Sequence, residues 1–345
     1  MSERVSHPMS RIFGNITDVK GIKVGVVTDR KAATGCTVIT VEKGAVAGVS
    51  VKGGAPGTRE TDLLDPLCRI EEVHAIALSG GSAFGLDVAC GVARYLEEKG
   101  HGLHRGPYTI PIVPAAIIFD LFIGNGRVRP DASWGYEAAL MAESGPVPEG
   151  SEGAGTGATV GKALGLASAV KAGQSSLSQV QPEGLVVGVL VVVNSLGDVV
   201  DQKGKLLAGP RDLETGEMKR TLEIFQRDHN SVDKNRGPLD KKGDSLKGKE
   251  GYGDNTTLAV VATNARLSKV EVNKLAGIAH NGLSTVIKPL HTAWDGDTIF
   301  TLATGEVSSP VDLVGAVATD LLSEAVLRAL FQAHSLGDIP SLKDL

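Results

Sequence analysis

The stretch GDNTTLAVVATNA, residues 253–265, places two threonines at the start of an apolar, β-branched run. Glycine, aspartate and asparagine precede the threonines and residues 258–263 follow them, so the stretch predicts a loop that enters a buried strand. A threonine in mid-chain is a weak nucleophile, whereas a threonine with a free α-amine carries a base beside its own hydroxyl. The stretch therefore suggests both a central strand and a reactive residue, Thr256, at its first position.

The composition is that of a well-packed globular protein. The 345 residues are 42% hydrophobic and 22% charged, which leaves room for one large domain or two ordinary ones. A formal net charge of -5, scattered cationic residues and 4% aromatic residues argue against a nucleic-acid partner and an acidic membrane surface. No apolar signal core opens the chain, and no run approaches the roughly 18 apolar residues of a membrane span.

The three cysteines point to a reducing compartment. Cys36, Cys68 and Cys90 stand in apolar contexts without the spacing of metal ligands or redox pairs. We therefore expect buried, reduced thiols and a cytoplasmic protein.

Short β-rich runs alternate with helical patterns along the chain. Several of the runs are apolar on both faces, which is typical of strands at the centre of a layered fold with helices outside. No internal repeat or clean linker interrupts the pattern, so we expect one domain over residues 1–345. The predicted strands are residues 36–51, 73–80, 184–193 and 255–265, and the predicted helices are 83–100, 133–144, 268–283 and 310–335.

Residues 226–253 break this pattern, because they are rich in Lys, Asp, Asn and Gly and contain almost nothing apolar. Such a segment cannot bury enough surface to order itself, so it predicts a flexible surface loop. One interpretation is an insertion tolerated for its low entropic cost. The other is a slack tether that delivers the Asn255–Thr256 bond to a processing site. Composition alone favours the insertion.

Two glycine-rich stretches resemble ligand loops without matching them. In residues 153–163 Thr156 stands where a phosphate loop needs its leading glycine, and Ala163 replaces the magnesium-binding hydroxyl. Residues 78–85 fit neither the nucleophile elbow nor the dinucleotide fingerprint. We expect this second stretch to be a tight strand-to-helix turn that walls a pocket.

Six motifs in a fixed order carry a family resemblance over almost the whole chain. The sequence resembles the DmpA-type aminopeptidase family, which includes L-aminopeptidase/D-esterases, β-aminopeptidases and NylC-type nylon-oligomer hydrolases, and its motifs are closest to the last group. The resemblance implies an α+β fold, a four-layer αββα sandwich similar to N-terminal-nucleophile hydrolases and to ornithine acetyltransferase. The motifs are GGAPGTRETDLL (53–64), SGGSAFGLD (79–87), GAGTGATVGK (153–162), VVVNSLGD (191–198), DNTTLAVVATNARLSKVEVNKLA (254–276) and HTAWDGDTIFTLATGE (291–306).

The resemblance also implies that the chain cuts itself between Asn255 and Thr256, giving an α chain of residues 1–255 and a β chain of 256–345. The Thr256 hydroxyl attacks the Asn255 carbonyl, the acyl group shifts from N to O, and water hydrolyses the ester. The released α-amine, with an ordinary pKa of roughly 7.7–8.0, is partly neutral near neutral pH and can accept the hydroxyl proton. One residue then supplies both nucleophile and base.

Asp295 and Asp297 flank Gly296, and in extended backbone both carboxylates would point to one side. There they could orient Thr256 and bind a protonated amine, although DGD alone is more often a turn. The NylC-type hydrolases resemble this chain in having Asp at both positions, whereas the aminopeptidases place Ser and Glu there.

Two further residues match catalytic positions of the family. Asn194 ends the strand predicted over 184–193 and is a candidate oxyanion donor, although Asn at a strand end is otherwise a common turn residue. Lys162 matches a lysine near the nucleophile, where its charge would favour the neutral amine of Thr256. A lysine after glycines is otherwise usually solvated.

Phe119 departs from the family pattern, because characterised members carry a tyrosine at the oxyanion site and phenylalanine has no hydroxyl to donate. Trp294, Phe119 and Phe84 are candidates for an apolar, substrate-binding channel suited to a methylene chain, or else belong to the core.

The sequence thus predicts a self-cleaving amide hydrolase that forms an acyl-enzyme at Thr256 and needs no cofactor or metal. Its expected partner is a small-molecule or short oligoamide substrate: an α-peptide, a β-peptide or an ω-amino acid oligomer. We also expect a homo-oligomer, a tetramer or larger. The alternatives are an acyltransferase of the ornithine acetyltransferase-like fold and an unprocessed, inactive binding homologue.

Overall fold

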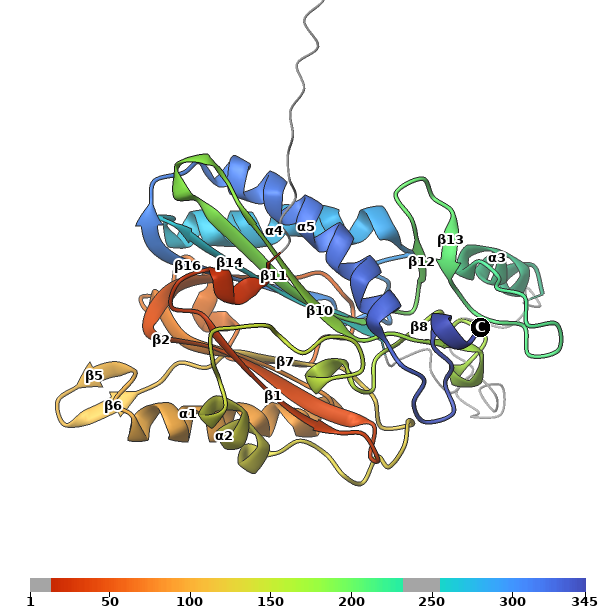
Figure 1. Ribbon diagram of the computed structural model, residues 1–345, viewed down its shortest axis with the longest axis horizontal. Coiled ribbons are helices and arrows are strands. Elements are labelled where there is room, and N and C mark those ends of the chain that lie inside the picture. The colour runs from red at the N-terminus through yellow and green to blue at the C-terminus, as the bar shows by residue number, and fades with distance from the viewer. Residues whose placement is uncertain (1–13, 232–254) are drawn as a thin grey trace, which may run out of the picture.

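Figure 1 shows the computed structural model of the chain, which describes residues 14–231 and 255–345. Its centre is a nine-stranded sheet with the order β10-β11-β14-β16-β2-β4-β7-β3, and β1 pairs with β2 beside this path. The strands are β1 (Lys23–Asp29), β2 (Thr34–Val51), β3 (Thr58–Arg59), β4 (Glu72–Ser79), β7 (Ala115–Ile117), β10 (Gln174–Val180), β11 (Val186–Asn194), β14 (Thr256–Ala265) and β16 (Thr298–Val307).

The long strand β2 belongs to two layers of this sheet. Its first half pairs with β1 and β4, and its second half pairs with β16. The register against β4 shifts between Thr40 and Ala45. The sheet is thereby divided into two halves that share an inner core, in which Ile76 of β4 packs in the same cluster as Val260 of β14 and Phe300 of β16.

Helices cover the outer face of each half, as Figure 1 shows from top to bottom. Helices α4 (Lys269–Val286) and α5 (Val311–Gln332) pack over β10, β11, β16 and the second half of β2. Helices α1 (Val88–Glu98) and α2 (Ala132–Leu140) pack over β1, β4 and the first half of β2. The predicted α+β fold, a four-layer αββα sandwich, is confirmed.

Strand β11 shows why its sequence is apolar throughout. Val189 and Val191 point outward into the core beneath α4 and α5, while Leu190 and Val192 point into the core between the two halves. Both faces of the strand are therefore buried, and the alternating face rule of strands leaves no position for a polar residue. Strand β14 behaves in the same way, with Val261 outside and Val260 inside.

Smaller elements complete the described chain. They are the strands β5 (Leu103–Arg105), β6 (Tyr108–Ile110), β8 (Thr159–Val160), β9 (Val170–Lys171), β12 (Asp198–Val200), β13 (Leu206–Ala208) and β15 (Ile287–Lys288), helix α3 (Thr221–Ser231), and the 3₁₀ turns η1 (Ile16–Asp18), η2 (Asp62–Leu64), η3 (Ser82–Asp87), η4 (Gly153–Gly155), η5 (Leu166–Ser168), η6 (Pro182–Gly184) and η7 (Leu342–Asp344).

The helix predicted over 83–100 was wrong at its start, because residues 82–87 form the 3₁₀ turn η3 and α1 begins only at Val88. Gly81 and Ser82 have positive φ values of 82° and 55°, which turn the chain sharply after β4. A Cβ on Gly85 would lie 1.9 Å from the Gly80 carbonyl oxygen, so the turn is too close-packed for a regular helix. The prediction of a tight strand-to-helix turn is confirmed.

The predicted loop over 226–253 was wrong at its beginning, where residues 226–231 continue helix α3. The remainder of that prediction lies outside the described residues. The prediction of three buried thiols was wrong for two of them: Cys36 is buried, Cys68 is partly exposed, and Cys90 lies on the outer side of α1. Within residues 14–231 and 255–345, no helix is long and apolar enough to span a bilayer.

The contact between β2 and α4 gives a test of the packing. Gly48 of β2 faces the helix so closely that a Cβ there would lie 2.6 Å from the Asn273 amide nitrogen and 2.7 Å from the Val272 carbonyl carbon. Both atoms are backbone, so Gly48→Ala must push the helix away. We expect a loss of about 1–3 kcal/mol in the free energy of unfolding, measured by equilibrium urea denaturation.

Gly277 on the same helix is the matched control. Nothing lies within 4 Å of a Cβ added there, so Gly277→Ala relieves only the poor helix propensity of glycine. We expect this variant to be unchanged or more stable by up to about 1 kcal/mol. Equal stability of the Gly48→Ala variant and the parent would contradict the close helix–sheet contact.

Candidate functional site

The candidate site lies where three chain segments meet at one edge of the sheet. Asn194, the last residue of β11, is the antiparallel partner of Thr256, the first residue of β14. Asn255 forms a parallel bridge with Asp295, which belongs to the loop before β16. Sheet pairing therefore brings together Thr256, Asn194 and the DGD segment, as the sequence predicts. Thr256 is buried, with 4% of its surface exposed.

The peptide bond before Thr256 is held in a polarised environment. The Thr256 hydroxyl lies 2.5 Å from the Asn255 carbonyl oxygen. The Gly296 amide donates a hydrogen bond of 2.8 Å to that same oxygen. A Cβ at residue 296 would lie 2.7 Å from the Thr256 hydroxyl oxygen, so only glycine leaves space for the nucleophile. This arrangement places a hydroxyl and an oxyanion donor at one carbonyl group.

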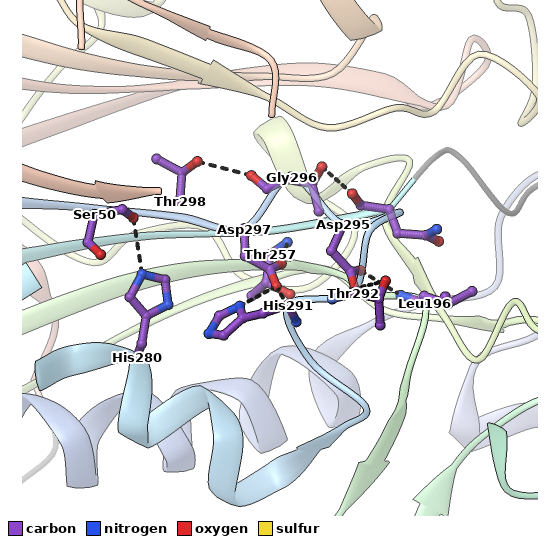
Figure 2. A network of polar contacts seen from close by, with 12 residues as sticks. Ser50, Leu196, Thr257, His280, His291, Thr292, Asp295, Gly296, Asp297 and Thr298 are labelled. Atoms are coloured by element: carbon purple, nitrogen blue, oxygen red, sulfur yellow. Dashed lines mark hydrogen bonds and ion pairs between the residues drawn. The ribbon is translucent and has the colours of Figure 1, made fainter. Parts of the chain in front are cut away.

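Asp297 is fully buried, and its two oxygens have different partners. Oδ1 accepts the Thr257 amide at 2.7 Å. Oδ2 accepts both the backbone amide of His291, at 3.1 Å, and its Nδ1, at 2.7 Å (Figure 2). The carboxylate thus joins the residue that follows Thr256 to the loop before β16.

Asp295 repeats this pattern on the other side of Gly296 (Figure 2). Its Oδ2 accepts the amide and the hydroxyl of Thr292 at 2.9 and 2.6 Å, and its Oδ1 accepts the Leu196 amide at 3.3 Å. Burial, together with the neighbouring negative charge of Asp297, raises the pKa of the Asp295 carboxyl above its ordinary value, and the Thr292 and Leu196 donors oppose that rise.

Lys162 and Asn194 form the other side of the site, and both are buried. The Lys162 ammonium donates to the Asn194 backbone oxygen at 3.0 Å and to its Oδ1 at 2.8 Å, and the Thr159 amide donates to the same Oδ1 at 3.1 Å. The Asn194 Nδ2 donates to the Phe119 carbonyl at 3.3 Å. These contacts fix the amide, with its oxygen toward Lys162 and its nitrogen toward Phe119.

The three predicted aromatic residues occupy different surroundings. Phe119 lines a small pocket with Lys162, Thr159, Asp120, Ile123, Leu166 and Phe122, and its ring lies 5.0 Å from that of Phe122. Trp294 is half-exposed, and its carbonyl accepts the Asn255 Nδ2 at 3.5 Å. Phe84 is also exposed and packs under the Arg129 guanidinium, 3.8 Å from the ring centre. Only Phe119 of the three lines this pocket.

The two glycine-rich stretches, residues 78–85 and 153–163, contact buried charged residues near the site. The amide of Gly81, in the turn after β4, donates to the Asp120 Oδ1 at 2.7 Å, and the Thr34 hydroxyl donates to its Oδ2 at 2.7 Å. Burial raises the pKa of Asp120 to about 6. This aspartate lines the Phe119 pocket, whereas residues 78–85, which were expected to wall a pocket, do not line it and contact it only through Asp120.

In the other glycine-rich stretch, residues 153–163, the Lys171 ammonium donates to the backbone oxygens of Gly155 and Ala158. It also donates to the backbone oxygen of Ala172. Lys171 is completely buried, which lowers the pKa of its ammonium to about 7. Backbone carbonyls of this stretch therefore face the buried Lys171 ammonium group. A phosphate loop instead directs its backbone amides at the ligand.

Sequence analysis missed four residues of the site: Leu196, His291, Thr292 and Gly296. Gly296 and Leu196 contribute backbone amides, which no side-chain motif reveals. His291 and Thr292 do stand in the motif HTAWDGD. Donor side chains a few residues before a pair of aspartates are a signal that could have pointed to them.

Comparisons with known proteins identify the family to which the chain belongs. The model of peptidase family S58 matches residues 14–340. A protein described as an uncharacterized aminopeptidase of Mycobacterium bovis is 38% identical, over 96% of this chain and 98% of its own. A 6-aminohexanoate-oligomer endohydrolase of Paenarthrobacter ureafaciens is 29% identical, over 90% of this chain and 84% of its own.

Solved structures share the fold. An L-aminopeptidase D-Ala-esterase/amidase from Ochrobactrum anthropi, described as a new variant of the Ntn hydrolase fold, superposes with a TM-score of 0.67 at 18% identity, covering 95% of this chain and 90% of that one. A β-aminopeptidase from Burkholderia gives a TM-score of 0.63 at 19% identity, covering 96% and 90%. The chain therefore belongs to peptidase family S58 and is an amide-bond hydrolase.

Proposed function

We propose that the chain cleaves itself between Asn255 and Thr256 and then hydrolyses short amides with Thr256 as its nucleophile. The observation that carries the proposal is the convergence of the Thr256 hydroxyl and the Gly296 amide on the Asn255 carbonyl oxygen, at 2.5 and 2.8 Å. A carbonyl that accepts a fixed amide donor is prepared for the negative charge that develops when a nucleophile adds to its carbon.

Self-cleavage proceeds in two balanced steps. The Thr256 oxygen adds to the Asn255 carbonyl carbon, and its hydroxyl proton passes to the amide nitrogen. Collapse of the intermediate then breaks the C–N bond, so that the acyl group is on oxygen and the nitrogen is a free amine. Water then hydrolyses the ester to the Asn255 carboxylate and regenerates the hydroxyl. The products are an α chain of residues 1–255 and a β chain of residues 256–345.

Turnover repeats the same chemistry on a substrate. The Thr256 amine removes the hydroxyl proton, the oxygen attacks the substrate amide carbon, and the leaving amine takes the proton. Water hydrolyses the acyl-enzyme. The buried Lys162 ammonium favours the neutral form of the Thr256 amine, and Asn194, fixed by Lys162 and Phe119, supplies an amide near the oxyanion.

The proposed substrates are short amino-acyl amides and 6-aminohexanoate oligomers. Two features support this class: the likeness to aminopeptidases and to a 6-aminohexanoate-oligomer endohydrolase, and the apolar walls of the Phe119 pocket beside Lys162. Phenylalanine at position 119 makes this wall apolar, which suits a methylene chain. A cytoplasmic location and a homo-oligomer, a tetramer or larger, complete the proposal.

Self-cleavage is tested by mass and by N-terminal sequencing. Because the nucleophile is the residue whose amine is released, purified protein should contain a fragment that begins Thr256-Thr257-Leu258. Thr256→Ala should remain one chain, and Thr256→Ser should still cleave because it keeps a hydroxyl and a nascent amine. A fragment that begins at Thr257 would move the nucleophile by one residue, and an intact parent chain would favour the binding homologue.

The substrate class is tested with free and N-acetylated 6-aminohexanoate oligomers and with amino-acyl p-nitroanilides. Asp295 and Asp297, which the sequence suggested could bind a protonated amine, are both buried, and their oxygens accept hydrogen bonds from the protein. Neither carboxylate is therefore exposed to a substrate's ammonium group. We therefore expect kcat/KM values for the free and acetylated oligomers to agree within about 3-fold.

A 10- to 100-fold preference for the free amine, the size expected for about 1.5–3 kcal/mol of charge-assisted contact, would instead indicate an exo-acting enzyme with an ammonium site. Transfer of the acyl group to an added amine faster than hydrolysis would indicate an acyltransferase. Fully processed protein that releases no amine from any of these compounds would contradict the hydrolase proposal itself.

A further inference from the structure

Two consecutive residues of the loop before β16 each hold one aspartate of the site in the same way. His291 donates its backbone amide and its Nδ1 to Oδ2 of Asp297. Thr292 donates its backbone amide and its hydroxyl to Oδ2 of Asp295 (Figure 2). Each residue thus forms a two-donor clamp on one oxygen of one carboxylate.

The clamps leave the second oxygen of each carboxylate for a reacting segment. Asp297 Oδ1 accepts the amide of Thr257, the residue bonded to the nucleophile, at 2.7 Å. Asp295 Oδ1 accepts the amide of Leu196, two residues after Asn194, at 3.3 Å. The aspartates therefore connect the dipeptide His291-Thr292 to the start of β14 and to the chain just after the end of β11.

The clamps donate hydrogen bonds to two buried carboxylates, whose burial would cost free energy without such donors. Both aspartates are buried, and two carboxylates on either side of one glycine repel each other. His291 has a φ of 59°, the left-handed region that a residue other than glycine enters at a cost. Its ring packs edge-on against that of His280, 4.7 Å away, and the His280 Nε2 lies 3.0 Å from the Ser50 carbonyl oxygen.

We propose that His291 and Thr292 are positioning residues for the nucleophile and the oxyanion donor, and that they act through Asp297 and Asp295. The inference rests on the proposed function of Thr256. Fixing the Thr257 amide fixes the peptide plane that follows Thr256 and with it the backbone that carries the Thr256 side chain. Fixing the Leu196 amide does the same for the chain that leaves Asn194.

Thr292 offers the sharper test, because valine has the same shape without the hydroxyl. Thr292→Val removes one donor from a buried carboxylate, so we expect kcat to fall about 10- to 100-fold with KM changed less than 2-fold. Thr292→Ser keeps the hydroxyl and should restore kcat to within about 3-fold of the parent. Rates are expressed per fragment that begins at Thr256, and unfolding free energies are measured alongside.

The pH profile separates positioning from packing. The Thr292 hydroxyl stabilises the ionised form of Asp295, so its loss raises the pKa of this carboxyl further. The acid limb of kcat in Thr292→Val should therefore move to higher pH, while Thr292→Ser should match the parent. Among the described residues, Asp297 is the charged neighbour of this carboxyl, and His291 is paired with Asp297. His280 of α4 and Lys52 after β2 lie around that pair, and Lys162 contacts Asn194.

His291 is tested with an amide in place of the imidazole. Asparagine tolerates the left-handed backbone and can donate its side-chain N–H, so His291→Asn should keep kcat and the rate of self-cleavage within about 3-fold. His291→Ala should slow both about 10- to 100-fold. His74→Leu is the control for the loss of a buried imidazole, because His74 lies on β4 and its Nδ1 accepts the Ile112 amide at 3.2 Å. It should lower stability and leave kcat unchanged.

Each outcome decides the inference. Parental kcat and an unmoved acid limb in Thr292→Val would overturn it, as would equal losses of kcat in His74→Leu and His291→Ala. A His291→Ala or Thr292→Val variant that reacts more slowly but unfolds like the parent supports the inference, provided that His291→Asn or Thr292→Ser regains the rate. Failure of the proposed self-cleavage gives a different result, because the parent protein itself would then lack the fragment that begins at Thr256.

Discussion

The parallel pairing of β14 with β16 is the constraint on which the site depends. Leu258 and Thr298 are register partners, so both strands begin at the same edge of the sheet. The residues just before each strand, Asn255 and Asp295, are therefore forced together and form the bridge that brings the Gly296 amide to the Asn255 carbonyl. An antiparallel pair at this point would have carried the two segments to opposite edges.

The buried charged groups in this region have many hydrogen bonds to the chain's own backbone. The aspartates accept amides from Thr257, His291, Thr292 and Leu196. Behind the Phe119 pocket, Asp120 accepts the Gly81 amide, and the Lys171 ammonium donates to three carbonyls. Buried charges are expensive unless they are hydrogen-bonded, so these contacts give the site a rigid frame before any substrate enters.

Much of the frame could be predicted from local sequence signals. The apolar faces of β11 and β14 predict central strands. A threonine at the first position of β14 and an asparagine at the last position of β11 indicate the site. Periodicity does not predict the register between two strands, so the pairing of Asn194 with Thr256 could be seen only in the structure.

The strands β10 and β16 were not predicted, because Thr, Ser and Gln interrupt their apolar pattern. Strand β1 was not predicted either, because its apolar run, residues 24–27, is only four residues long. The partners of the DGD carboxylates were also beyond sequence analysis. They are mostly backbone amides, whose positions follow from tertiary pairing and leave no trace in composition. The turn over residues 78–85 was predicted, but the late start of α1 was not, because the 3₁₀ turn over residues 82–87 has a sequence that also fits a helix.

The position of β14 and β16 in the strand order determines when the molecule can be completed. These two strands come from the last ninety or so residues of the chain, yet they lie between β11 and β2, which come from the earlier part. The sheet therefore stays open in the middle until the end of the chain has been synthesised, and long-range pairing of this kind is intrinsically slow to form. The same insertion interlocks the two products of the proposed scission, because the shorter fragment has sheet hydrogen bonds to the longer one on both sides. Separating the fragments would require unfolding both.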